Sequence, residues 1–150
     1  MITRDIPLDS MQATGALGQR LSEALQVGDA LLLSGDLGAG KTELARAVIR
    51  ARAGQPIDVP SPTFNLVIPY EFRDLLITHF DLYRLEGADD VMELGFLDAL
   101  DDGSVIVEWP DRLGDLTPSE ALRIELTAVS DRRQARVSGP AAIVERFLGA

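Results

Sequence analysis

The stretch Gly35-Asp36-Leu37-Gly38-Ala39-Gly40-Lys41-Thr42 decides how this chain of 150 residues is interpreted. It has the spacing of a phosphate-binding loop, in which two glycines frame four residues and a lysine and a hydroxyl residue follow. Glycines let the backbone come close to phosphates, and the inward-pointing N–H groups form an anion site. Lys41 is expected to reach the β- and γ-phosphates, and the hydroxyl of Thr42 to ligate Mg²⁺. The sequence therefore predicts a nucleoside triphosphate site, with ATP and Mg²⁺ as its ligands.

The residues on either side of this loop suit the same site. Residues 30–33 are wholly apolar, as a strand buried on both faces of a sheet is. Residues 42–53 have the pattern of a helix, and Gly54 is a suitable terminator. The positive N-terminal end of that helix would point at the phosphates. A buried strand, a glycine-rich loop and a helix in this order are the context that the motif requires.

The remaining segments predict a sheet with both parallel and antiparallel strands. Helices are expected over residues 11–26, 88–100 (with a break at Gly95) and 141–148. Strands are expected over residues 3–8, 64–72, 75–81, 105–107, 122–129 and 135–137, with hairpins at 64–81 and 122–137. Residues 58–62 hold two prolines and predict an exposed, extended loop. We expect one α/β domain over residues 1–150, P-loop NTPase-like, with a mixed, mainly parallel sheet flanked by helices.

The composition limits the classes of partner. The net charge is −10, from 14 basic and 24 acidic residues, and Lys41 is the only lysine. Because nucleic-acid binders gain affinity by neutralising phosphates, autonomous RNA binding is not expected, and a protein partner is favoured. The absence of cysteine excludes disulfides and thiolate zinc sites. No apolar run suits a membrane span or a secretory signal, so we expect a cytoplasmic protein, monomeric when alone.

Two acidic residues at strand ends are candidates for binding Mg²⁺ or its waters. Asp81 follows the strand-like residues 75–80, and Glu108 follows residues 105–107, the cleaner buried strand. Either acid could hold the metal or act as the catalytic base, and these alternatives stay open. His79, the only histidine, is expected to be structural. Trp109, the only tryptophan, either packs in the core or stacks on a nucleobase.

Four segments occur together in an informative order: GDLGAGKT (35–42), SPTF (61–64), HFDLYRL (79–85) and VEWPDRL (107–113). This combination, over about residues 7–137, resembles the TsaE (YjeE) family, small ATPases of bacterial threonylcarbamoyladenosine biosynthesis. The resemblance implies a compact P-loop fold and a weak ATPase activity that supports the partners TsaD and TsaB. It implies that these partners transfer the threonylcarbamoyl group to the adenosine next to the anticodon, so that tRNA is met only through their complex.

The resemblance also implies roles for individual residues. Residues implied to contact the nucleotide are Thr14, Asp36, Leu37, Gly38, Ala39, Gly40, Lys41, Thr42, Trp109 and Arg133, the last two near the base. Those implied to hold the metal are Thr42, Asp81 and Glu108, and those implied in catalysis are Lys41, Asp81 and Glu108. Residues 61–63 resemble a switch loop that responds to the γ-phosphate. Glu43 and Arg132 depart from the residues that are usual in the family at their positions.

Two other functions fit a phosphate loop. A small-molecule kinase would need an acceptor pocket and usually an arginine-bearing lid, but the one plausible insert, residues 54–63, is short and contains no arginine. A binding module could instead use the nucleotide only as a switch, with hydrolysis incidental. The sequence has no Asn-Lys-x-Asp guanine signature, which favours adenine.

Overall fold

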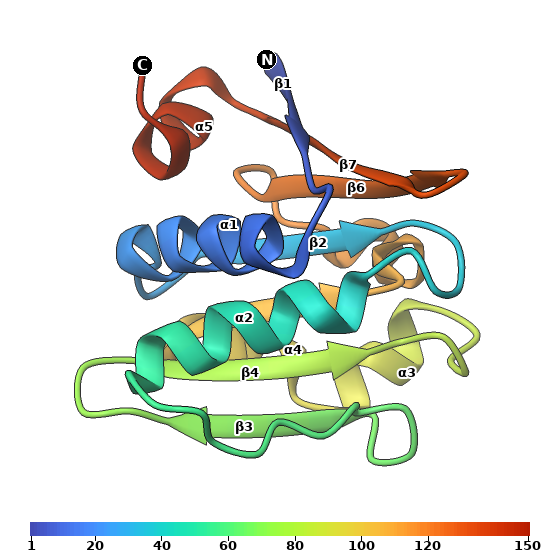
Figure 1. Ribbon diagram of the computed structural model, residues 1–150. Coiled ribbons are helices and arrows are strands. Elements are labelled where there is room, and N and C mark those ends of the chain that lie inside the picture. Colours follow the sequence, from blue (N-terminus) through green and yellow to red (C-terminus); the bar gives the residue numbers. More distant parts are fainter.

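The computed structural model describes residues 1–150, except for the side chain of Val129. Its strands form one sheet in the order β1-β7-β6-β2-β5-β4-β3 (Figure 1). The strands are β1 (Ile2–Pro7), β2 (Ala30–Ser34), β3 (Val67–Glu71), β4 (Leu76–Asp81), β5 (Ser104–Glu108), β6 (Leu122–Val129) and β7 (Arg132–Gly139). The helices are α1 (Met11–Ala24), α2 (Lys41–Ala53), α3 (Ala88–Glu93), α4 (Phe96–Asp102), α5 (Ala141–Leu148) and the 3₁₀ helix η1 (Pro110–Leu116).

The centre of the sheet is parallel and its margins are antiparallel. Strands β6, β2, β5 and β4 run parallel to one another, whereas β1 and β7 on one side and β3 on the other are antiparallel to their neighbours. The predicted mixed, mainly parallel α/β fold is therefore confirmed. The parallel arrangement brings the carboxyl ends of β2, β5 and β4 to one edge, where open α/β sheets bind their ligands.

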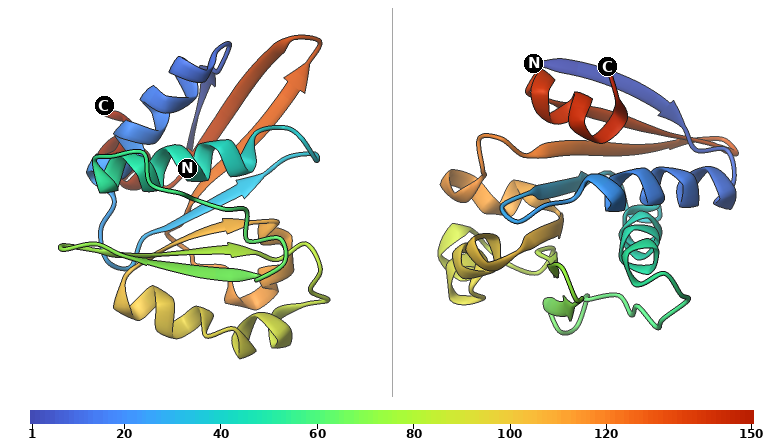
Figure 2. Two further views of the ribbon diagram at one scale, coloured as in Figure 1. Left: turned by 60° about the horizontal axis from the view of Figure 1, so that its bottom comes forward. Right: turned by 90° about the vertical axis from the view of Figure 1, so that its left-hand side faces the viewer.

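Helices cover both faces of the sheet (Figure 2). Helices α1, α2 and α5 pack on one face, and α3, α4 and η1 pack on the other. The position of β2 between two cores explains why residues 30–33 are all apolar: Leu31 and Leu33 belong to the first core, and Leu32 belongs to the second. Successive side chains of a strand point to opposite faces, so a strand between two cores needs apolar residues at every position.

The observed helix boundaries follow from local chemistry. The side chain of Ser10 caps α1 by accepting a hydrogen bond from the N–H of Ala13 at 3.1 Å. Gly95, with φ of 81°, separates α3 from α4, as the predicted break at this glycine required. Gly54 ends α2 in the left-handed conformation.

Three expectations about loops need correction. Residues 58–62 are extended but not wholly exposed, since Val59 and Pro62 are buried and the Nε of Arg46 donates to the carbonyl of Val59 at 2.7 Å. The strand predicted from residue 64 begins only at Val67, because residues 62–65 form a turn. The second hairpin turns at residues 130–131, so that Arg132 pairs with Val129 inside the ladder instead of lying in the turn.

None of the helices in the described part of the chain combines the length and the apolar character of a membrane span.

The contact between α1 and α2 generates a stability prediction. Gly18 is buried in α1, and a Cβ placed there would lie 2.5 Å from the Cβ of Ala47 and 2.8 Å from its carbonyl carbon. Gly18→Ala should therefore force the helices apart and cost about 1–3 kcal/mol in the free energy of unfolding. Gly15→Ala, on the exposed side of the same helix with no atom within 4 Å, is the matched control.

The control should stabilise the protein by up to about 1 kcal/mol, since alanine is the better helix former. Urea unfolding followed by circular dichroism measures both changes. Equal effects of the two substitutions on the unfolding midpoint would contradict the close approach of α1 and α2.

Candidate nucleotide-binding site

The phosphate-loop motif connects the end of β2 to the start of α2, at the carboxyl edge of the parallel strands (Figure 1). Gly35 passes so close to β6 that a Cβ there would collide with the carbonyl oxygen of Leu126. Gly40 is the N-cap of α2 with φ of 111°, a conformation that favours glycine. The exposed residues Asp36, Leu37 and Gly38 form the tip of the loop. The two framing glycines are thus required by a close approach and by a backbone angle.

Lys41 is folded back onto its own loop. Its Nζ donates to the carbonyl oxygens of Gly35 at 2.6 Å and Asp36 at 2.9 Å, and lies 4.3 Å from the centre of the Trp109 ring. The residue is only 5% exposed. Desolvation lowers the pKa of the Lys41 ammonium, and the negative charges of Glu108 and Asp81 oppose that shift. The site therefore contains a desolvated cation that an anionic ligand would stabilise.

Thr42 and Glu108 meet across two elements. The hydroxyl of Thr42 donates to Oε1 of Glu108 at 2.9 Å, although the two residues are 66 positions apart. Glu108 is buried at the end of β5, and the β4–β5 register places the buried Asp81 directly beside it. Because the Thr42 proton points to the carboxylate, the lone pairs of its oxygen stay available to a cation.

These oxygen ligands fit Mg²⁺ bound together with a nucleotide. Among the described residues, no group of three or more His, Cys, Asp or Glu side chains could hold a metal by itself. Mg²⁺ is commonly bound by one or two protein oxygens, several waters and substrate phosphates. The hydroxyl of Thr42 and the two buried carboxylates match that set, so the donor chemistry of the site agrees with the predicted metal.

Asp81 is linked to residues 61–63, the segment that resembles a switch loop. Thr63 Oγ1 donates to Asp81 Oδ2 at 3.3 Å, and the hydroxyls of Ser61 and Thr63 are 2.7 Å apart. The other carboxylate oxygen of Asp81 accepts from the backbone N–H of Tyr83 at 3.1 Å. Residues 61–63 therefore contact the candidate metal site through a single side chain, that of Asp81.

Sequence reasoning missed the part of His79 in the site. The ring is fully buried, and its Nε2 lies 2.7 Å from Oε2 of Glu108. The signal that could have found this contact is the spacing of β4, since His79 lies two residues before Asp81 and points to the same face. A buried histidine next to a buried carboxylate is a polar cluster within an otherwise apolar sheet.

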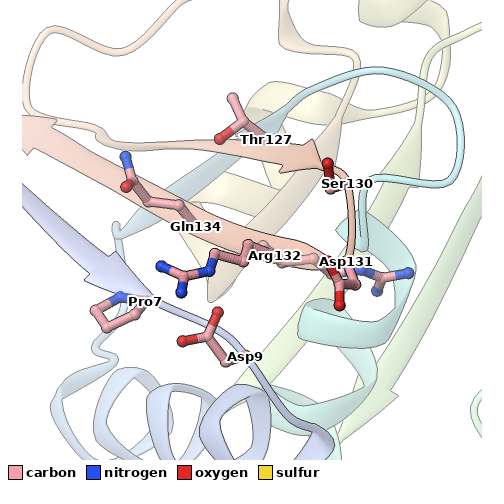
Figure 3. Close-up of a pocket in the computed structure, with 8 residues that line it drawn as sticks. Pro7, Asp9, Thr127, Ser130, Asp131, Arg132 and Gln134 are labelled. Atoms are coloured by element: carbon pink, nitrogen blue, oxygen red, sulfur yellow. The ribbon is translucent and has the colours of Figure 1, made fainter.

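Thr14 and Arg133 lie together on the other side of the loop. Both line a hollow of about 210 Å³ that also involves Asp9 and Asp131. Nη1 of Arg133 lies 3.4 Å from the point that a Cβ on Gly40 would occupy, so this guanidinium borders the phosphate loop. A neighbouring hollow of about 550 Å³ lies between the β6–β7 hairpin and the chain around Pro7, and Arg132 lines it (Figure 3).

The structure does not bring Trp109 to this hollow. Strands β6 and β2 separate β5 from β7, which places about 14 Å of sheet between the strands that carry Trp109 and Arg133. Trp109 instead has φ of 60° and packs on Lys41, with its ring 4.8 Å from that of Tyr83. Its role as a stacking surface for the base stays a prediction.

Two other arginines have contacts away from the loop. Nε of Arg112 donates to the carbonyl of Leu85 at 2.8 Å, and Nη1 pairs with Asp111 at 2.5 Å. The guanidinium of Arg84 lies 5.0 Å from the ring of Phe64. Neither contact places these guanidinium groups on the phosphate loop.

Comparisons with known proteins agree on one family. The sequence model of the family described as "Threonylcarbamoyl adenosine biosynthesis protein TsaE" matches residues 8–136. Proteins named tRNA threonylcarbamoyladenosine biosynthesis protein TsaE are 35% identical over 127 residues in Rickettsia conorii (85% of this chain, 73% of the relative) and 36% identical over 132 residues in Mycobacterium leprae (81% and 80%). The relative of that name in Synechocystis is 38% identical over 121 residues, covering 75% and 73%.

A solved structure has the same fold. The crystal structure of YdiB from Bacillus subtilis superposes with a TM-score of 0.73 at 25% identity, covering 97% of this chain and 89% of that one. The family match spans the phosphate loop, Asp81, Glu108 and Arg133 in one continuous stretch. The chain therefore belongs to the TsaE family, whose proteins are involved in tRNA threonylcarbamoyladenosine biosynthesis.

Proposed function

We propose that this chain binds ATP with Mg²⁺ and hydrolyses it slowly, and that this activity supports a TsaD–TsaB complex in tRNA threonylcarbamoyl modification. The observation that carries the proposal is the convergence of Lys41, Thr42 and Glu108 at the start of α2. Ammonium, hydroxyl and carboxylate groups at a helix N-terminus are the set that a bound triphosphate with a divalent cation needs. The names of the relatives support the pathway.

The nucleotide would lie across the loop with its phosphates inside. Lys41 would exchange the carbonyls of Gly35 and Asp36 for the β- and γ-phosphates, which places its charge where phosphates concentrate negative charge. The nucleoside would extend toward the hollow lined by Thr14 and Arg133. Mg²⁺, held by Thr42 with Glu108 and Asp81 directly or through water, would neutralise charge on the β- and γ-phosphates.

Hydrolysis would proceed by in-line attack of water on the γ-phosphate. Loop N–H groups and Lys41 would stabilise the charge that develops on the phosphoryl oxygens. Both candidate bases already accept hydrogen bonds within the protein: Glu108 from Thr42 and Asp81 from Tyr83. A carboxylate engaged in this way is a poorer base, which supports a slow intrinsic rate.

The partners would act through residues 61–63. Thr63 contacts Asp81, so a protein that moves this segment would also change the contacts of that carboxylate. The contacts of Arg84 and Arg112 do not direct either guanidinium at the phosphate loop. A partner that orders the segment would therefore accelerate a reaction that the isolated chain performs slowly.

Lys41→Met should abolish nucleotide binding while leaving the fold intact. The wild-type protein in ATP and Mg²⁺ at about 100 times the dissociation constant should gain about 2.7 kcal/mol, and the variant should gain none. Without nucleotide, the variant should melt at the same temperature or higher, because a desolvated ammonium is removed. Thermal unfolding with and without ATP measures both effects, with the exposed Arg73→Ala at the β3–β4 turn as the control cation. An unchanged ATP-dependent shift in Lys41→Met would contradict the site.

Removing either candidate metal acid should lower the hydrolysis rate. Glu108→Gln and Asp81→Asn keep size and remove charge, so each should reduce kcat by about 10²-fold or more if it holds the cation or positions the attacking water. Asp101→Asn, an exposed acid in α4, is the matched control and should leave kcat unchanged. Phosphate release at saturating ATP tests this expectation, which fails if both acid variants hydrolyse ATP at the wild-type rate.

Phosphate release with and without TsaD and TsaB separates the three functional hypotheses. A partner-controlled ATPase should turn over slowly alone and faster with both partners. A small-molecule kinase should consume ATP only when an acceptor is added. A nucleotide switch should bind the partners in a nucleotide-dependent way even when Glu108→Gln blocks hydrolysis. Full-speed hydrolysis by the isolated chain with no effect of the partners would reject the proposal.

A further inference from the structure

Among the buried ionisable side chains of the described residues, His79 is the one that the proposed reaction leaves without a role. It is fully buried on β4, between β5 and β3 in the sheet. Its Nε2 lies 2.7 Å from Oε2 of Glu108, and its Nδ1 is buried with no hydrogen-bond partner in the described structure. Burying a polar ring in an apolar sheet is unfavourable, because a nitrogen that water would solvate is left unpaired. The one hydrogen bond that the ring makes among the described residues is with Glu108.

Glu108 is held at both carboxylate oxygens by other side chains. Oε1 accepts from the hydroxyl of Thr42 at 2.9 Å, and Oε2 faces the ring of His79. Because a carboxylate oxygen accepts hydrogen bonds, we assign the hydrogen of this contact to Nε2 of His79, which donates it. The result is a chain of two hydrogen bonds from β4 through β5 to the first turn of α2.

We propose that His79 is a positioning residue for the cation site. By fixing the carboxylate of Glu108, it fixes the direction in which the Thr42 proton points, so that the lone pairs of the Thr42 oxygen would be free to bind a cation. The inference rests on the proposed function for its consequence, but the hydrogen-bond chain stands on geometry alone. Residues that orient metal ligands in this way typically change metal affinity 10–100-fold when removed.

Two amide substitutions of similar size distinguish donation from packing. His79→Gln can place an amide N–H where Nε2 lies, whereas the shorter His79→Asn reaches only the position of Nδ1. Isothermal titration of ADP, in Mg²⁺ and in EDTA, measures the effect without any turnover. The measured quantity is the Mg²⁺ concentration at which half of the metal-dependent increase in ADP affinity is reached. For His79→Asn this concentration should be at least about tenfold higher than for wild type, whereas His79→Gln should stay close to wild type. Affinity in EDTA should be the same for all three proteins.

Double substitutions test whether His79 acts through Glu108, and they use both amide replacements so that the test does not depend on one variant. If His79 acts through Glu108, adding His79→Gln or His79→Asn to Glu108→Gln should cause no further loss of metal dependence. The proposal is overturned if His79→Asn matches wild type, if His79→Gln is as impaired as His79→Asn, or if the losses in the double variants add. Wild-type protein that binds ADP equally with and without Mg²⁺ would instead reject the proposed metal site itself.

The ring hydrogen gives a second, spectroscopic readout. Because the chain has one histidine, tag-free ¹⁵N-labelled protein gives a single set of imidazole signals. We expect the tautomer with hydrogen on Nε2, and a shift of that signal in Glu108→Gln but not in the control Asp101→Asn. A hydrogen found on Nδ1 alone would leave Nε2 as an acceptor facing a carboxylate, and would overturn the proposal.

Discussion

The hydrogen bond between Thr42 and Glu108 joins the two halves of the candidate site. It links the first turn of α2 to the end of β5, across 66 residues of sequence. The bond forms because β2 and β5 are adjacent and parallel, so the loop after one strand and the acid at the end of the other meet at the same sheet edge. His79 bonds to the same carboxylate, and Lys41 directly precedes Thr42 at the start of α2.

The site concentrates buried ionisable side chains next to the two apolar cores. Lys41, His79, Asp81 and Glu108 are each buried, at 5%, 0%, 6% and 2% exposure. Burying such groups is unfavourable, and hydrogen bonds among them offset only part of that cost. The stability of the protein must therefore come from the two apolar cores on either side of β2. Within the site, the carboxylate of Glu108 is already held by Thr42 and His79, whereas Lys41 is bonded to its own loop.

Local patterns predicted most of the fold, because they are set by neighbouring residues. The apolar run of β2, the loop glycines and the break at Gly95 each depend on a few positions. What the sequence did not reveal depends on pairing between distant segments. The contact of His79 with Glu108 spans 29 residues and follows from the β4–β5 register, and the burial of Val59 follows from packing against α2. The placement of Trp109 on Lys41 depends on a positive φ that composition does not predict.

The two acids of the site differ in what holds them. Glu108 is fixed by side chains from a helix and a strand, whereas Asp81 contacts Thr63 in the loop that precedes β3. Helix and strand positions are held by many backbone hydrogen bonds, and loop segments are the parts of a fold that open at the lowest free energy. A change in residues 61–63 would thus reach Asp81 before it reached Glu108. Asp81 is thus the acid of the site that is linked to the 61–63 loop, and Glu108 is the acid that is held between a helix and a strand.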